Sequence, residues 1–138
     1  MRSATRVLDS YSIIAFLREE PGADEVRELF RSARDSEQPL LLSTVNWGEV
    51  FYITLRRMGP QRADELSQFL TKLPIEVVPA DLELARQAAV FKATKKMSYA
   101  DCFAAALAKL RKAELVTGDR EFKQVEGEVK ILWISSGF

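Results

Sequence analysis

Short apolar segments of the kind that form buried strands alternate with longer segments of helical periodicity along the whole chain. We expect strands at residues 6–8, 39–42, 75–78, 115–117 and 130–134. We expect helices at residues 11–17, 23–34, 44–58, 61–73, 81–93 and 98–112. Strands that alternate with helices predict an α/β fold, with a parallel sheet that helices cover on both faces.

No linker, repeat or low-complexity stretch interrupts the 138 residues, so we expect a single domain over residues 1–138. The helical pattern predicts four inward-facing residues in the segment 61–73: Leu66, Phe69, Leu70 and Leu73. The early helices also carry more large apolar side chains than one small sheet obviously buries, including Phe30, Phe51, Tyr52 and Phe69. A surplus of that kind predicts contact with a partner.

The chain contains no histidine and a single cysteine, Cys102. The absence of histidine excludes Ser-His-Asp and Cys-His catalysis, and it excludes any metal site with imidazole ligands. One cysteine forms neither an internal disulfide nor a thiolate zinc site, and Cys102, inside an apolar helix, is expected to be an inert core thiol. Any metal must therefore be bound by oxygen atoms, which favours Mg²⁺ or Mn²⁺.

Charge and hydropathy bear on partners and location. The 20 Lys and Arg residues balance the 20 Asp and Glu residues, so any contact with nucleic acid must come from a local basic patch. No apolar run approaches the ~18 residues of a membrane span, and residues 1–7 lack the apolar core of a signal peptide. With the lone cysteine, these features favour a cytoplasmic protein without membrane contact.

Four acidic residues stand close to the ends of the expected strands: Asp9, Glu49, Asp101 and Asp119. Asp9 follows the first strand and Asp119 follows the fourth. Glu49 lies early in the helix after the second strand, and Asp101 lies in the first turn of the helix that leads to the fourth. Because the functional crevice of an open α/β sheet lies at the carboxyl ends of its strands, the four acids are candidates for one site.

Each acid also has a purely structural interpretation. Asp9 can cap a helix, and Gly118-Asp119 is a common turn pair. The segment Ser98-Tyr-Ala-Asp101 has the spacing of a capping box. Glu49 lies on a helix with almost no polar face before Arg56, so we expect it to be partly buried and paired either with an arginine such as Arg56 or with a metal.

Taken together, the four acids favour a metal site. Two like charges ~4 Å apart cost about 4 kcal/mol at an effective dielectric constant of about 20. That cost is a large fraction of the stability of a small domain, so capping alone does not account for several such pairs. A divalent cation turns the repulsion into attraction, and it can polarise a phosphodiester and activate a water molecule.

Four segments carry a further indication: VLDSYSIIAFL (residues 7–17), NWGEVFY (46–52), SYADCFAAALA (98–108) and LVTGDREF (115–122). In their order and spacing, over nearly the whole chain, the protein resembles the PIN-domain ribonucleases, in particular the VapC-type toxins of toxin–antitoxin pairs. The resemblance implies a three-layer α/β/α sandwich around a parallel five-stranded sheet.

The resemblance also assigns roles. It implies that Asp9, Glu49, Asp101 and Asp119 are the catalytic quartet that binds Mg²⁺ or Mn²⁺ and cleaves RNA. Ser10 and Thr117 would match supporting hydroxyl residues, and Glu121 would be a spare carboxylate or one that supports the quartet without binding the metal. Family members commonly form homodimers and are silenced by a cognate antitoxin protein that occupies the active-site groove. The candidate contacts to RNA are basic residues: Arg18, Arg56, Arg57, Lys92, Lys95, Lys96, Arg120 and Lys123.

Two other interpretations stay open. One is a non-catalytic PIN-like scaffold that only binds a partner protein. The other is a phosphoaspartyl phosphatase-like enzyme with Asp9 as the nucleophile. That mechanism needs a second aspartate two residues later, where this chain has Tyr11.

Overall fold

One parallel five-stranded sheet, in the order β3-β2-β1-β4-β5, organises the computed structural model, which describes residues 4–136. The strands are β1 (Arg6–Leu8), β2 (Leu40–Ser43), β3 (Ile75–Val78), β4 (Glu114–Thr117) and β5 (Ile131–Trp133). The helices are α1 (Ser10–Leu17), α2 (Ala23–Ser36), α3 (Thr44–Met58), α4 (Pro60–Leu70), α5 (Leu82–Thr94), α6 (Tyr99–Arg111) and the 3-10 helix η1 (Arg120–Val125). The α/β class with a parallel five-stranded sheet is confirmed.

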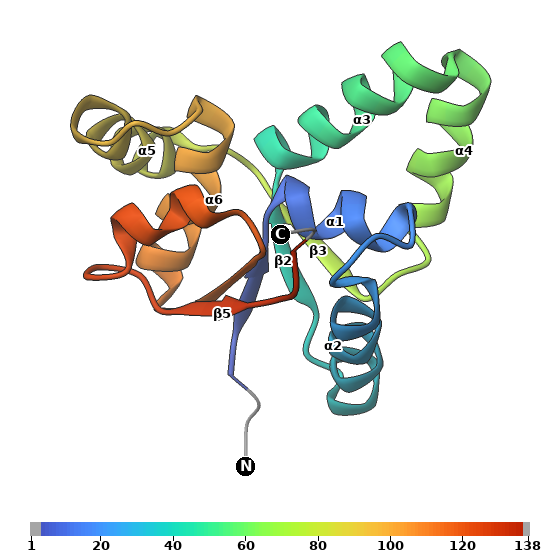
Figure 1. Cartoon of the computed structure of the whole chain (residues 1–138), viewed down its shortest axis with the longest axis horizontal. Coiled ribbons are helices and arrows are strands. Elements are labelled where there is room, and N and C mark those ends of the chain that lie inside the picture. The colour runs from blue at the N-terminus through green and yellow to red at the C-terminus, as the bar shows by residue number, and fades with distance from the viewer. Residues whose placement is uncertain (1–3, 137–138) are drawn as a thin grey trace.

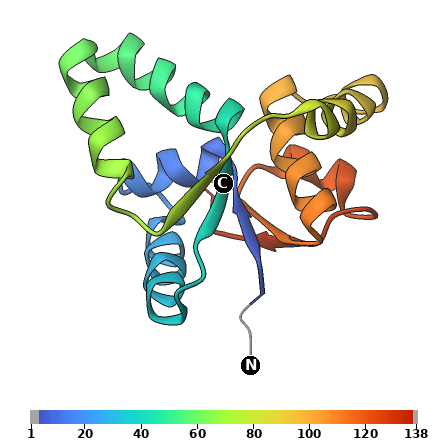
Figure 2. The same ribbon diagram turned by 180° about the vertical axis from the view of Figure 1, so that it is seen from behind.

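Helices lie on both faces of the sheet, as Figures 1 and 2 show from opposite sides. Successive strand residues point to opposite faces, and the two cores follow this alternation. Val7 and Leu115 belong to the cluster that contains α5, α6 and η1, whereas Leu8 and Val116 belong to the cluster that contains α1, α2 and α4. The expected three-layer sandwich is therefore present.

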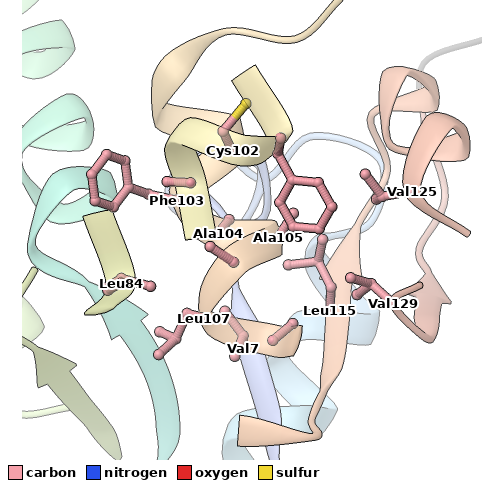
Figure 3. Packing of buried hydrophobic residues seen from close by; sticks show 14 of the residues in the cluster. Val7, Leu84, Cys102, Phe103, Ala104, Ala105, Leu107, Leu115, Val125 and Val129 are labelled. Atoms are coloured by element: carbon pink, nitrogen blue, oxygen red, sulfur yellow. The ribbon is translucent and has the colours of Figure 1, made fainter. Parts of the chain in front are cut away.

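Small side chains let α6 approach the sheet closely. Its buried face contains four alanines: Ala104, Ala105, Ala106 and Ala108. In Figure 3, Leu107 of this helix lies close to Val7 of β1, and Cys102 lies at the upper end of the same packed group. Cys102 is fully buried and unpaired, as expected for a core thiol, and burial raises its pKa.

The strand order places a topological switch beside β1. The chain runs from β1 through β2 to β3 on one side, then returns to β4 and β5 on the other. Asp9 and Asp119 follow the neighbouring strands β1 and β4, which pair in parallel. Ligands of open α/β sheets bind at such a point, so the fold brings these two acids to the expected location.

Two expectations about the helices are wrong, and one helix was not expected. Helix α4 ends at Leu70, and Phe69 is 43% exposed, since it lines an open groove with residues of α1 and α3. Phe30 is 5% exposed and packs against Phe16 of α1, so it is part of the core and not of a surface surplus. The helix η1 was not expected, since its six residues carry too few apolar positions to show a period.

Among residues 4–136, no helix has both the length and the apolar character that crossing a membrane requires.

Candidate metal centre

Asp9 is a wholly buried carboxylate between β1 and α1. It is the N-cap of α1, because its Oδ1 accepts a 2.8 Å hydrogen bond from the backbone N–H of Ser12. Its Oδ2 accepts a 2.5 Å hydrogen bond from the hydroxyl of Thr117 at the end of β4. The capping interpretation of Asp9 is therefore correct, and it does not exclude a role in a metal site.

The environment of Asp9 disfavours its charged form. Burial raises the pKa of Asp9 from 3.8 to about 6, and the negative charge of Asp119 acts in the same direction. The hydrogen bonds from Thr117 and Ser12 stabilise the charged form and oppose the shift only in part. In the metal-free protein Asp9 thus titrates well above the ordinary range for an aspartate.

Asp101 occupies the first turn of α6 and is partly exposed. Its backbone N–H donates a 3.2 Å hydrogen bond to Ser98 Oγ, which confirms that Ser98 caps the helix. Burial, together with the negative charges of Asp9, Asp119 and Glu49, raises the pKa of Asp101 from 3.8 to about 7. All four predicted acids therefore lie within electrostatic reach of one another around Asp101.

Asp119 and Glu121 face Asp101 from the segment after β4. One carboxylate oxygen from each of these three residues can be chosen so that all three lie within 4.8 Å of one another. The Thr117 hydroxyl accepts a 3.0 Å hydrogen bond from the N–H of Asp119, and Asp119 Oδ1 accepts one of 3.0 Å from the N–H of Glu121. Glu121, expected as a spare carboxylate, belongs to the closest group of acids.

Glu49 reaches the site from α3 and is partly buried, as expected. Of the neighbouring charges that raise the pKa of Asp101, that of Glu49 has the smallest effect. Within residues 4–136, no ion pair includes Glu49. The guanidinium of Arg56 lies instead 5.0 Å from the ring centroid of Tyr52, so, of the two alternatives for Glu49, the described residues do not show the ion pair with Arg56.

A network of buried polar residues that sequence reasoning missed lies beneath the acids. It contains Ser12, whose hydroxyl donates a 2.7 Å hydrogen bond to Val116 O, and also Ser43 and Asn46. Ser10, expected to support the quartet, is buried and bonds to Asn46 rather than to a carboxylate. Asn46, inside an otherwise apolar stretch of α3, was the one visible sign of this network.

The basic residues expected to contact RNA differ in what their side chains contact in the structure. Arg120, between Asp119 and Glu121, lies 5.2 Å from the ring centroid of Trp133. Lys92 donates a 2.8 Å hydrogen bond to Met97 O, and Lys95 lies 4.0 Å from a carboxylate oxygen of Glu128. Two further basic candidates, Lys96 and Lys123, are exposed at the α5–α6 connection and in η1.

The turn after β4 is tightly enclosed by neighbouring side chains. Together with the burial of Asp9, this packing argues against the phosphatase-like alternative. A Cβ atom at Gly118 would lie 2.6 Å from the ring of Tyr11, so only glycine fits there. Tyr11 thus fills the place where a phosphoaspartyl phosphatase needs its second aspartate. Asp9 is inaccessible, and both of its oxygens already accept hydrogen bonds, so the geometry disfavours Asp9 as a nucleophile.

Comparison with known proteins identifies the family. The family model described as PIN domain matches residues 6–128. The chain belongs to the PIN domain family. This match spans all four acids as well as Glu121.

Individual relatives are more distant. A VapC ribonuclease from Mycobacterium bovis (Mb0640) and Ribonuclease VapC30 from Mycobacterium tuberculosis are each 26% identical over 127 residues, which cover 87% of this chain and 94% of the relative. A DNA-bound VapBC from Salmonella typhimurium has a TM-score of 0.74 at 20% identity, with 94% of this chain and 98% of that chain covered. FitAcB from Neisseria gonorrhoeae has a TM-score of 0.69 at 21% identity, with 93% and 96% covered. The two solved structures share the fold.

Proposed function

We propose that this protein is a divalent-metal-dependent ribonuclease that cleaves RNA phosphodiester bonds. One observation carries the proposal: carboxylate oxygens of Asp101, Asp119 and Glu121 converge to within 4.8 Å beside the buried Asp9, at the switch point of the sheet. The names of the 26% identical relatives, which are ribonucleases, agree with it.

The donor set fits a hard cation. All the donors are carboxylate oxygens, which Mg²⁺ and Mn²⁺ prefer. Within residues 4–136, no lysine or arginine forms an ion pair with Asp9, Asp101, Asp119 or Glu121. A cation bound among them would supply the missing positive charge. We assign Asp101, Asp119 and Glu121 as its nearest ligands, with Glu49 adding charge and further oxygen atoms and the buried Asp9 adding negative charge.

The chain's own residues prepare this site for hydrolysis. When bound, Mg²⁺ or Mn²⁺ supplies a Lewis acid that polarises the phosphoryl group and lowers the pKa of water. Thr117 and Ser12 hold the carboxylate of Asp9 in one orientation from two directions. Asp101, whose pKa is about 7 without metal, exchanges its proton near neutral pH, so metal entry is coupled to proton release.

A cognate antitoxin is the partner that we propose for this ribonuclease, which would make it the toxin of the pair. Several proteins that share its fold come from VapBC or other toxin–antitoxin complexes. A groove of about 340 Å³ between α1, α3 and α4 offers a docking surface, with apolar residues such as Leu17, Ile53, Met58 and Phe69 and with the charged Arg18. Met58 and Phe69 are both exposed.

The homodimer stays a prediction, and so does the cytoplasmic location. Light scattering of the purified chain tests the first directly, because a dimer doubles the mass of 15.6 kDa. A monomer at high micromolar concentration would contradict it.

Cleavage of an RNA pool tests the enzymatic proposal. We expect cutting in Mn²⁺ or Mg²⁺, none after chelation with EDTA, and recovery when the metal is restored. Cutting that persists after complete chelation would contradict the metal dependence. No cutting in any metal, from a folded protein free of antitoxin, would favour the scaffold that only binds a partner.

A further inference from the structure

The side chain of Asn46 links three elements in the interior of the protein. Asn46 is fully buried in α3. Its Oδ1 accepts a 2.7 Å hydrogen bond from Ser43 Oγ of β2, and its Nδ2 donates one of 3.1 Å to Ser10 Oγ of α1 and another of 3.1 Å to the carbonyl oxygen of Ala100 in α6. Both hydrogens of the amide are therefore used.

The two acceptors of the Asn46 amide group are the immediate neighbours of two site acids. Ser10 follows Asp9, and Ala100 precedes Asp101. On α3 itself, Glu49 lies three residues after Asn46, which places the two side chains on neighbouring parts of one helix face. A single amide thus connects the backbone segments that carry three of the four acids.

The chemistry of the amide explains why an apolar residue would not replace it. An apolar side chain would remove the present donor from the buried Ser10 hydroxyl and from the partly buried Ala100 carbonyl, which is costly. Apolar contacts are also not directional, whereas two hydrogen bonds from one planar group fix the distance and direction of both neighbours. The bonds hold α1, α3 and α6 in one arrangement.

We propose that Asn46 is a positioning residue that sets the separation of Asp9, Glu49 and Asp101, and thereby the affinity of the site for its divalent cation. The proposal rests on the proposed function, because the acids must bind a metal for their separation to matter. The Asn46 side chain is fully buried and bonded to Ser43, Ser10 and Ala100, so in this proposal it acts only through the segments that it holds.

The test compares Asn46→Ala with Val26→Ala, a buried residue of α2 that makes none of these hydrogen bonds. The dissociation constant for Mn²⁺ is measured by titration calorimetry on each folded protein, and kcat and KM are measured on one RNA. For Asn46→Ala we expect Mn²⁺ binding weaker by about tenfold or more, a similar loss in kcat, and a nearly unchanged KM. Val26→Ala is expected to lose thermal stability but to bind Mn²⁺ within about threefold of the unmodified chain.

A second variant keeps the proposal testable if Asn46→Ala does not fold. Ser10→Ala removes one of the two acceptors and leaves the bond to Ala100, so we expect a smaller loss of Mn²⁺ affinity in a folded protein. Wild-type affinity in either Asn46→Ala or Ser10→Ala, or equal losses in Asn46→Ala and Val26→Ala, would overturn the proposal. If the unmodified chain itself neither binds Mn²⁺ nor cuts RNA, the proposed function has failed instead.

Discussion

The hydroxyl of Thr117 donates a 2.5 Å hydrogen bond to Oδ2 of Asp9 across 108 residues of sequence. The same hydroxyl accepts a 3.0 Å hydrogen bond from the backbone N–H of Asp119. One oxygen atom therefore joins the ends of β1 and β4 and orients two of the proposed site acids. Because Thr117 and Asp9 are fully buried, water cannot replace this bond readily.

Thr117→Val should weaken both the fold and the site. Valine keeps the shape but not the hydroxyl, so we expect a loss of about 1.5–3 kcal/mol in the free energy of unfolding, the range for hydrogen bonds to charged groups. The pKa of Asp9 should rise further, because this bond stabilises the charged form. Denaturant unfolding measures the first effect, and Mn²⁺ titration should give a weaker affinity.

Thr54→Val is the matched control. The Thr54 hydroxyl donates only to Val50 O within α3 and is partly exposed. We expect a small change in stability and no change in Mn²⁺ affinity. Equal effects of the two substitutions on Mn²⁺ binding would show that the Thr117–Asp9 bond has no special role.

The stability of the metal-free protein should depend on pH with a definite sign. The folded-state pKa values of Asp9 and Asp101, about 6 and about 7, exceed the ordinary value of 3.8. As pH rises above about 4, the unfolded chain loses these protons first, so the free energy of unfolding falls until about pH 7. The raised pKa values of Asp9 and Asp101 therefore do not lower the free energy of unfolding at a pH below 3.8, the pKa in the unfolded chain. They lower it fully at a pH above the folded-state values.

Melting curves in EDTA across this pH range test that dependence, with Asp101→Asn as the comparison. The substitution removes one of the two titrating groups, so its curve should fall less steeply than that of the unmodified chain. In Mn²⁺ the slope should shrink or reverse, because protons and metal compete for the carboxylates. Parallel curves for the two proteins in EDTA would refute the raised pKa of Asp101.

Glu121→Gln should separate a metal ligand from a surface acid. The Glu121 carboxylate lies in the closest group of acids, so we expect weaker Mn²⁺ binding, by about tenfold or more, with little change in stability in EDTA. Glu126→Gln removes the same charge from an exposed position just after η1 and should leave the affinity unchanged. Calorimetric titration with Mn²⁺ measures the affinity of both variants. Identical affinities would count against Glu121 as a metal ligand.

The groove between α1, α3 and α4 gives a test of the partner. Phe69→Glu puts a charge into this groove and should greatly reduce co-purification of the proposed cognate antitoxin when the two are co-expressed, while metal-dependent cleavage persists. Leu82→Glu makes the same change on α5, where Leu82 is 85% exposed, and should leave binding intact. If Phe69→Glu retains the antitoxin as well as the unmodified chain does, the antitoxin does not bind in this groove.

Much of this architecture follows from local patterns in the sequence. The strands and most helices are short, uniform segments with clear boundaries: Asp9 and Ser98 cap α1 and α6, and Gly59-Pro60 separates α3 from α4. The positions of the acids after the strands then follow from the parallel sheet. Glu121 and Asn46 were harder to assign, because their importance depends on neighbours more than 15 residues away in sequence, such as Asp101, Ser10 and Ala100.

Side-chain partners on the surface were the least predictable feature. Arg56 is seven residues from Glu49 on the same helix, yet its guanidinium lies over Tyr52. Phe69 satisfies the helical pattern but is 43% exposed at the groove between α1, α3 and α4, whereas the buried positions of α4 are Ala63, Leu66 and Leu70. Such choices depend on small differences in free energy between alternative contacts, which residue type alone does not reveal.

Asp101→Asn tests the central claim most directly, with Asp81→Asn as its control. Asp81 caps α5 by accepting a 2.9 Å hydrogen bond from the N–H of Leu84, and it is not among the charges that raise the pKa of Asp9 or Asp101. Asparagine at position 81 can still cap α5, and α6 is capped by Ser98 rather than by Asp101, so both variants should fold. Only Asp101→Asn removes a negative charge from a group of carboxylates that repel one another when no metal is bound. In EDTA it should therefore be at least as stable as the unmodified chain.

The deciding measurement is RNA cleavage by Asp101→Asn in Mn²⁺, together with its melting temperature with and without the metal. We expect nearly complete loss of cleavage and a smaller Mn²⁺-induced rise in melting temperature, because that rise follows the ratio of metal concentration to Kd. Asp81→Asn should retain both. A folded Asp101→Asn protein that cuts RNA at the unmodified rate would contradict the assignment of this site.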